Sequence, residues 1–180
     1  ALEAGTYVLV YKNAGDNQAV TYTVGGTELV ASGINISTGR LNYAGKTYDS
    51  WIAGNEPTTR QRWDVSASTS ISGRWMFWIQ ETWPRYIMLD GNGSVFTANH
   101  YNVDRGSFTY ANNGKLSVLS GASTRYLQNY KPATVNEAEG TAYTLYKETT
   151  DTAPGAFTQG GLVVKNTYEL GADRLTVKKQ

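Results

Sequence analysis

The sequence contains no cysteine, and this absence removes several kinds of chemistry at once. Without cysteine the chain can form no disulfide, no thiolate nucleophile and no cysteine-based metal site. The sequence also contains a single histidine, His100, which lies among residues typical of a loop. One histidine without cysteine gives no metal-ligand spacing of the kind found in zinc sites. We therefore expect neither a bound metal nor a cofactor.

Strong charge and long apolar runs are also missing. The 16 basic and 15 acidic residues give a net charge of +1 and are scattered, so we expect no nucleic-acid partner. No run approaches the roughly 20 apolar residues that cross a bilayer, so we expect no membrane insertion. The segment Asp90-Gly91-Asn92-Gly93-Ser94 lacks the later ligands of a calcium loop and indicates a hairpin turn. No pair of carboxylates is singled out for glycoside hydrolysis, and we expect no enzyme activity.

The sequence is rich in strand-forming and turn-forming residues. It has 13 Tyr, 5 Trp and 19 Gly, with Gly, Asn, Asp and Ser separating short apolar segments. Residues 73–148 contain one pattern of four such segments twice. The first pass comprises Trp75–Trp78, Arg85–Leu89, Val95–Phe96 and Ser107–Tyr110; the second comprises Leu116–Val118, Arg125–Leu127, Val135 and Ala142–Tyr146. Each pass predicts a four-stranded unit, in a repeat of about 40 residues.

The first 66 residues contain a third copy of the pattern. Its second and third strands are expected around Val20 and Leu29, and its fourth at Arg62–Val65. The interval of nine positions from Val20 to Leu29 recurs from Tyr86 to Val95 and from Tyr126 to Val135. This equality predicts one hairpin geometry in all three units. The fourth strand of the first copy comes late, because residues 33–60 form an insertion rich in Gly, Asn, Ser and Thr.

Three such units predict an all-β fold. One reading is a β-trefoil-like barrel, in which three units close on a shared axis and bury the apolar faces that each would leave exposed alone. A β-sandwich is the alternative, since it also has short strands at regular spacing. We expect this module at 1–148, a linker at 149–160 and a two-strand extension at 161–180. Two strands cannot form an independent domain, so the extension needs a partner.

Alternation along the strands predicts which aromatic residues lie inside. Tyr7, Leu9 and Tyr11 share one face of the first strand, and Val8 and Val10 share the other. In the fifth strand Trp75 and Phe77 share a face, so either this pair or the opposite one, Met76 and Trp78, points away from the centre.

Two other tryptophans are candidates for exposed binding platforms. Trp51 lies in the insertion, and Trp83 precedes Pro84 in a turn. Aromatic faces stack on the C–H patches of sugars, while amides and charged groups bind the hydroxyls. Asp49, Asn55 and Arg60 flank Trp51 and could supply such polar contacts. The alternative is that each tryptophan plugs a barrel end or pins its own loop.

The string Gln61-Arg62-Trp63 resembles the glutamine–any–tryptophan motif of ricin-type trefoil lectins. That resemblance implies that Trp63 packs in the core. The motif occurs once, with Ser107-Phe108 and Thr141-Ala142-Tyr143 in the corresponding places, and the sugar-binding pattern of that family as a whole is missing.

The C-terminal segment resembles the junction between tandem Cna-B-type domains of Gram-positive adhesins and pilins. The resemblance rests on Val163–Glu169, followed by Leu175–Lys179. The body is similar to modules of large surface proteins from gut Firmicutes and Actinobacteria, through Gly5–Leu9, Arg125–Leu127 and Leu145–Glu148. These resemblances imply an extracellular adhesin module attached to the cell wall through a part of the chain outside this sequence.

Two functions remain open for such a module. It could bind a host or dietary glycan or a host surface protein, or it could only space other domains of the same polypeptide. Cna-B domains form Lys–Asn isopeptide bonds, and Asn166 and Lys178 or Lys179 match such residues by position. The resemblance places the asparagine and the lysines in different domains, so we expect no isopeptide bond here.

Overall fold

The structure is a computed structural model that describes the backbone at residues 2–37, 40–43, 46–47, 58–148, 157–159, 166–171 and 174–179. Side-chain burial is described for residues 2–34 and 58–147. Three of the predicted site residues, Asp49, Trp51 and Asn55, lie outside the described residues.

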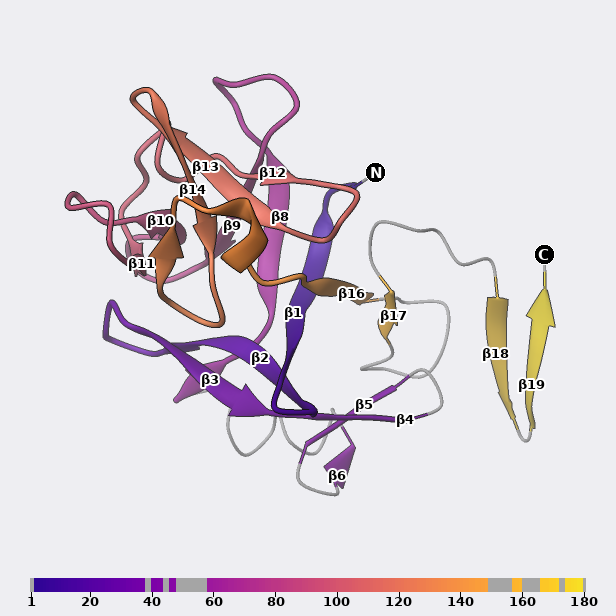
Figure 1. Ribbon diagram of the computed structural model, residues 1–180. Helices are drawn as coiled ribbons and strands as arrows, with labels where there is room; N and C mark the ends of the chain where they lie inside the picture. The colour runs from indigo at the N-terminus through magenta and orange to yellow at the C-terminus, as the bar shows by residue number, and fades with distance from the viewer. Residues whose placement is uncertain are drawn as a thin grey trace.

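The described residues form strands and one short 3-10 turn, with no α-helix among them (Figure 1). The first unit contains β1 (Gly5–Asn13), β2 (Asp16–Thr23), β3 (Leu29–Gly33) and β8 (Trp63–Ala67), with β4 (Asn35–Ser37), β5 (Arg40–Tyr43), β6 (Lys46–Thr47) and β7 (Thr59–Arg60) between β3 and β8. The second contains β9 (Trp75–Ile79), β10 (Arg85–Leu89), β11 (Phe96–Asn99) and β12 (Thr109–Tyr110). The third contains β13 (Leu116–Ser120), β14 (Ser123–Leu127), β15 (Ala133–Thr134), η1 (Glu137–Glu139) and β16 (Thr144–Glu148).

Six segments pair antiparallel in a nearly closed ring. Strand β1 pairs with both β16 and β8, and β8 pairs with β9. A single bridge from Trp75 to Phe108 leads to the segment of β12, which pairs with β13. A second bridge, from Lys115 to Ala142, leads back to the segment that continues as β16. The protein is therefore all-β, as the sequence predicts, with a barrel-like sheet joined to a second, four-stranded sheet.

Three hairpins accompany the ring: β2–β3, β10–β11 and β14–β15. The facing pairs nearest each turn are Tyr22 with Leu29, Leu89 with Phe96, and Leu127 with Ala133. The first two hairpins thus share one separation, while the third is one residue shorter. The equal spacing in the sequence indicates the hairpins, but it does not give their exact register. Bridges from Glu28 to Thr97 and from Val95 to Pro132 join neighbouring hairpins.

The core lies inside the ring and combines aromatic with aliphatic side chains. Tyr7, Leu9 and Tyr11 point into it from β1, as alternation predicts. Val8 and Val10, on the opposite face, are buried as well but lie outside this cluster. Large side chains from other parts of the chain also belong to the cluster, among them Tyr22, Leu29, Phe77, Phe96, Phe108, Leu116, Tyr143 and Leu145.

Trp63 lies fully buried in this core, as its motif implies. Its indole Nε1 donates a hydrogen bond to the carbonyl of Val20 at 2.9 Å, so its only polar group is satisfied. Tyr143, which the repeat places in the corresponding position of the third unit, is also buried and donates its hydroxyl proton to the carbonyl of Asn129. The aromatic residues at these positions thus tie barrel strands to the hairpins.

Strand β9 settles which of its two faces points inward. Phe77 is fully buried in the core, and Trp75 packs against the same cluster. Met76 and Trp78 therefore point away from the barrel centre. Met76 is buried there, whereas Trp78 is half-buried.

The last strands differ in part from the expected linker and extension. Strand β17 (Phe157–Gln159) falls within the predicted linker and pairs with β16. Strands β18 (Asn166–Gly171) and β19 (Arg174–Lys179) form a hairpin and pair with no other described strand. This hairpin sets Asn166 opposite Lys179 and Thr167 opposite Lys178. The prediction of a Cna-B-like junction at these strands stays a prediction.

Candidate functional site

The loop between β9 and β10 carries the most exposed aromatic side chain of the described residues. Trp83 is 67% exposed and stands in the sequence Thr82-Trp83-Pro84. Burying such a side chain would be favourable by a few kcal/mol, so its exposure on a folded surface is informative. Trp83 therefore does not plug a barrel end, which was one of the two alternatives for it.

The indole of Trp83 stacks on the imidazole of His100. Their ring centroids lie 6.2 Å apart, and the planes are inclined by only 22°. His100 follows β11 directly and is itself exposed. The contact orients Trp83 against its neighbour while most of the side chain stays exposed to solvent.

Three further aromatic rings contact one another in a row that begins on the outer face of β9 and β10, and the row ends at Tyr101, next to His100 in the chain. Trp78 and Tyr86 face each other across β9 and β10, with ring centroids 6.2 Å apart. Tyr86 in turn contacts Tyr101, at 4.8 Å between centroids. All three side chains are half-buried, so each presents part of its ring to solvent. We call Trp78, Trp83, Tyr86, His100 and Tyr101 the aromatic face.

Polar contacts to serine side chains hold rings of the aromatic face in place. The hydroxyl of Tyr101 lies 3.0 Å from Ser107 Oγ, which lies 2.9 Å from Ser68 Oγ. The indole Nε1 of Trp78 donates to Ser66 Oγ at 3.3 Å. Gly106 lets the ring of Tyr101 approach the backbone, since a Cβ there would lie 3.3 Å from two of its ring carbons. These contacts restrict the rings before any ligand arrives.

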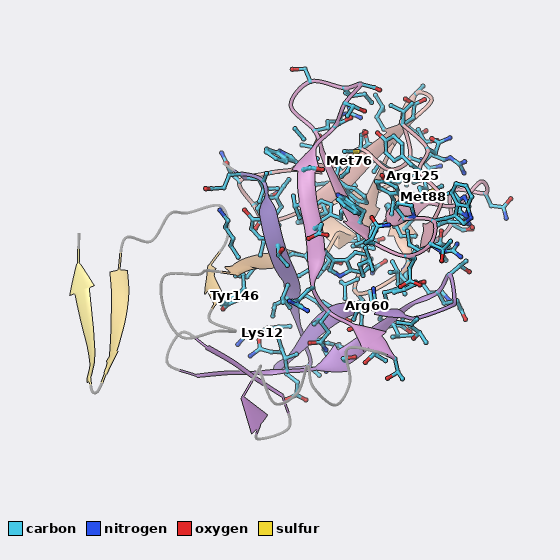
Figure 2. All side chains as sticks on the ribbon, turned by 180° about the vertical axis from the view of Figure 1, so that it is seen from behind. Lys12, Arg60, Met76, Met88, Arg125 and Tyr146 are labelled. Atoms are coloured by element: carbon cyan, nitrogen blue, oxygen red, sulfur yellow. The ribbon has the colours of Figure 1, made fainter. Side chains whose placement is uncertain are left out.

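Arg60 holds the loop of Trp83 in place. It lies at the end of β7, which pairs with β2, so it reaches the loop from another unit (Figure 2). Its guanidinium NH1 donates to the carbonyl of Gln80 at 3.0 Å and lies 3.0 Å from a carboxylate oxygen of Glu81. Among the predicted residues, Arg60 and Trp83 are therefore brought to one loop. Arg60 thus supports that loop, while the predicted relation of Arg60 to Trp51 lies outside the described residues.

The rest of the aromatic face is not predicted by sequence reasoning. The sequence pattern places His100 among loop residues and Tyr86 in a strand, and it assigns no role to Tyr101. The available signal is the alternation in Arg85–Leu89, which puts Tyr86 on the outer face with Trp78. His100 contacts Trp83 and Tyr101 contacts Tyr86 only because β11 ends just before them. The spacing of apolar segments in the sequence does not predict the residue at which β11 ends.

The arrangement offers flat apolar surfaces with polar groups at their edge. An indole and phenol rings can stack on the C–H faces of a sugar or on an apolar side chain. In the described part of the chain, no group of three or more acidic or histidine side chains is close enough to hold a metal ion. No helix among the described residues has the length and apolar character to cross a membrane. Comparison with protein-family models, curated proteins and solved structures gave no match.

Proposed function

We propose that this chain is a non-catalytic module of a bacterial cell-surface adhesin and that it binds a glycan or a host surface protein through the aromatic face. The observation that carries this proposal is the exposed Trp83, stacked on His100 and supported by Arg60. A ring held in place before binding loses little conformational freedom when a ligand stacks on it. The proposal places the module outside the cell and assigns it other domains of the same polypeptide as neighbours.

A glycan array with the purified chain tests this function. Trp83→Ala should lower binding to at least one of the ligands found by about tenfold or more, because the principal stacking surface is lost. Tyr130→Ala is the matched control: it removes an aromatic side chain that is also exposed but lies in the β14–β15 turn. Equal binding by the wild-type chain and Trp83→Ala would contradict the proposal, as would a blank array together with no binding to mucins.

A structural spacer is the alternative, and one observation favours it. The β18–β19 hairpin pairs with no other described strand, which fits a segment that joins this module to a neighbouring domain. A spacer needs no ligand, so the same array separates the two readings. A chain that binds nothing, yet stays folded between flanking domains, supports the spacer. Glycoside hydrolysis is the weakest candidate, since the proposed site offers aromatic rings and no facing carboxylates.

We also propose that the body is a β-trefoil. The order of pairing in the ring and the one hairpin in each unit support it over a sandwich. The test is a crystal structure in which residues 5–66, 73–111 and 114–147 superpose by rotations of about a third of a turn. Units that do not superpose would contradict the trefoil and leave the barrel-like sheet intact.

A further inference from the structure

A second candidate site lies on the outer face of β2, β1 and β16. The register of these strands builds it, because side chains two residues apart share a face. Lys12 in β1 is directly opposite Asn17 in β2. On the other side, Val10 is opposite Thr144 in β16, and Val8 is opposite Tyr146. Alternation turns this face away from the barrel interior, into which Tyr7 and Leu9 point.

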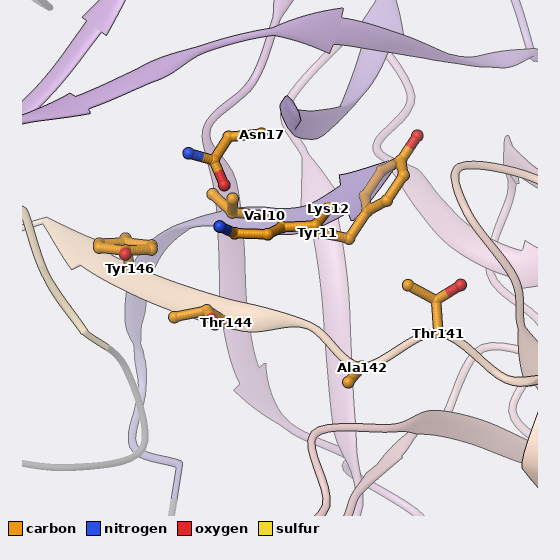
Figure 3. A pocket seen from close by; sticks show the side chains of 8 residues that line it. All are labelled: Val10, Tyr11, Lys12, Asn17, Thr141, Ala142, Thr144 and Tyr146. Carbon is orange, nitrogen blue, oxygen red and sulfur yellow. The ribbon is translucent and has the colours of Figure 1, made fainter. Parts of the chain in front are cut away.

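A pocket of about 560 Å³ opens over this face. That volume lies within the range of small-molecule binding sites. Figure 3 shows Lys12, Asn17 and Tyr146 gathered on one side of it, with Thr141 and Ala142 on the other. The lining residues are Val10, Tyr11, Lys12, Asn17, Thr141, Ala142, Thr144 and Tyr146.

Three polar groups of this pocket have no partner among the described residues, and the lining carries one sign of charge; the Thr141 hydroxyl, by contrast, accepts a hydrogen bond from the backbone N–H of Asn129. No lining residue is acidic, so the ammonium of Lys12 is the only formal charge among them. Within the described part of the chain, neither Lys12 Nζ, the Asn17 amide nor the Tyr146 hydroxyl has a hydrogen-bond or ion-pair partner. Burial raises the pKa of Tyr146, so its hydroxyl remains protonated and can donate at neutral pH.

We infer that this pocket binds the acidic monosaccharide unit of a glycan, with the carboxylate of the sugar on Lys12. The ammonium supplies a charge-assisted hydrogen bond to the carboxylate. The Asn17 amide and the Thr144 and Tyr146 hydroxyls supply the mixed donors and acceptors that sugar hydroxyls need. The site is separate from the aromatic face and does not depend on it.

Amide NMR on the full chain tests the inference, with glucuronic acid, galacturonic acid and N-acetylneuraminic acid as probes. Glucose and galactose are the neutral counterparts. We expect the acidic sugars to shift the amide signals of Lys12, Asn17 and Thr144, and added salt to weaken the effect. Lys12→Gln should weaken binding about tenfold, because it removes the charge and keeps a polar side chain.

Lys131→Gln is the matched control, since it lowers the net charge equally at an exposed lysine that is paired with Glu28. Lys131→Gln and Trp83→Ala should both leave binding of the acidic sugars unchanged. The inference is overturned if none of the three acids binds, if the neutral sugars bind as well as the acids, or if Lys12→Gln and Lys131→Gln behave alike. Loss of array binding in Trp83→Ala with acidic-sugar binding retained would separate the two sites.

Discussion

The surroundings of Trp63 and of Trp83 show two uses of one residue type in a single barrel. Trp63 is fully buried, and its Nε1 proton is bound by the carbonyl of Val20. Trp83 is 67% exposed and contacts His100, another exposed side chain. The first tryptophan holds a barrel strand to a hairpin, whereas the second leaves apolar area in water. This difference predicts that stability depends on the core and that recognition depends on the loop.

The largest effect is expected in the core. Trp63→Ala should lower the free energy of unfolding by about 3–5 kcal/mol, because a large cavity forms in the barrel. Urea unfolding followed by circular dichroism measures this change. Trp63→Phe should cost less, about 1–3 kcal/mol, since it mainly leaves the Val20 carbonyl without its donor. If Trp63→Ala cost less than 1 kcal/mol, the distinction between the two regions would fail.

An effect of intermediate size is expected from alkaline pH, which acts on the buried tyrosines. Burial raises the pKa of Tyr11 to about 12 and that of Tyr143 well above its ordinary value. In the unfolded chain these hydroxyls ionise near pH 10, so the unfolded state loses its protons first. The contribution of these tyrosines to the free energy of unfolding should therefore be fully present below about pH 10 and decrease as the pH rises toward about 12.

Urea unfolding at a series of alkaline pH values measures this loss. Tyr11→Phe is the informative variant, because it removes one of the raised pKa values while keeping the ring that contacts Tyr143. Its stability should decline less steeply between about pH 10 and about 12 than that of the wild-type chain. An identical decline in both chains would show that Tyr11 is not buried in solution.

The smallest effect on stability is expected at the exposed loop. Trp83→Ala should change the free energy of unfolding by no more than about 0.5 kcal/mol, because the side chain has little packing to lose. Thermal unfolding alongside the wild-type chain measures it. A loss as large as that of Trp63→Phe would mean that Trp83 is part of the folded core, and the binding role would lose its main support.

The sequence is informative about the core and much less so about the surface. Alternation in β1 places Tyr7, Leu9 and Tyr11 correctly inside, and the Gln61-Arg62-Trp63 string gives the burial of Trp63. These predictions succeed because a buried face imposes a strict period of two on a strand. The aromatic face depends on contacts between turns and strand ends. The two-residue alternation of a strand does not extend to turns, so it does not predict these contacts.

The pocket at Lys12 illustrates the same limit. Its residues come from three strands and from the segment just before β16, and only the strand register brings Lys12 opposite Asn17 and Val10 opposite Thr144. A shift of one residue would send each side chain to the other face. The sequence spacing predicts the hairpins but not these pairings, so the pocket cannot be predicted until the fold is known.

The pairing of β1 with β16 has a mechanical consequence. These strands are antiparallel neighbours, and Tyr7 near the start of β1 faces Lys147 near the end of β16. Tension applied at residues 5 and 148 would peel the two strands apart one pair at a time, since both anchor points sit at the same end of the ladder. Such a geometry resists pulling poorly. The body should therefore yield at low force when it is pulled between these two positions.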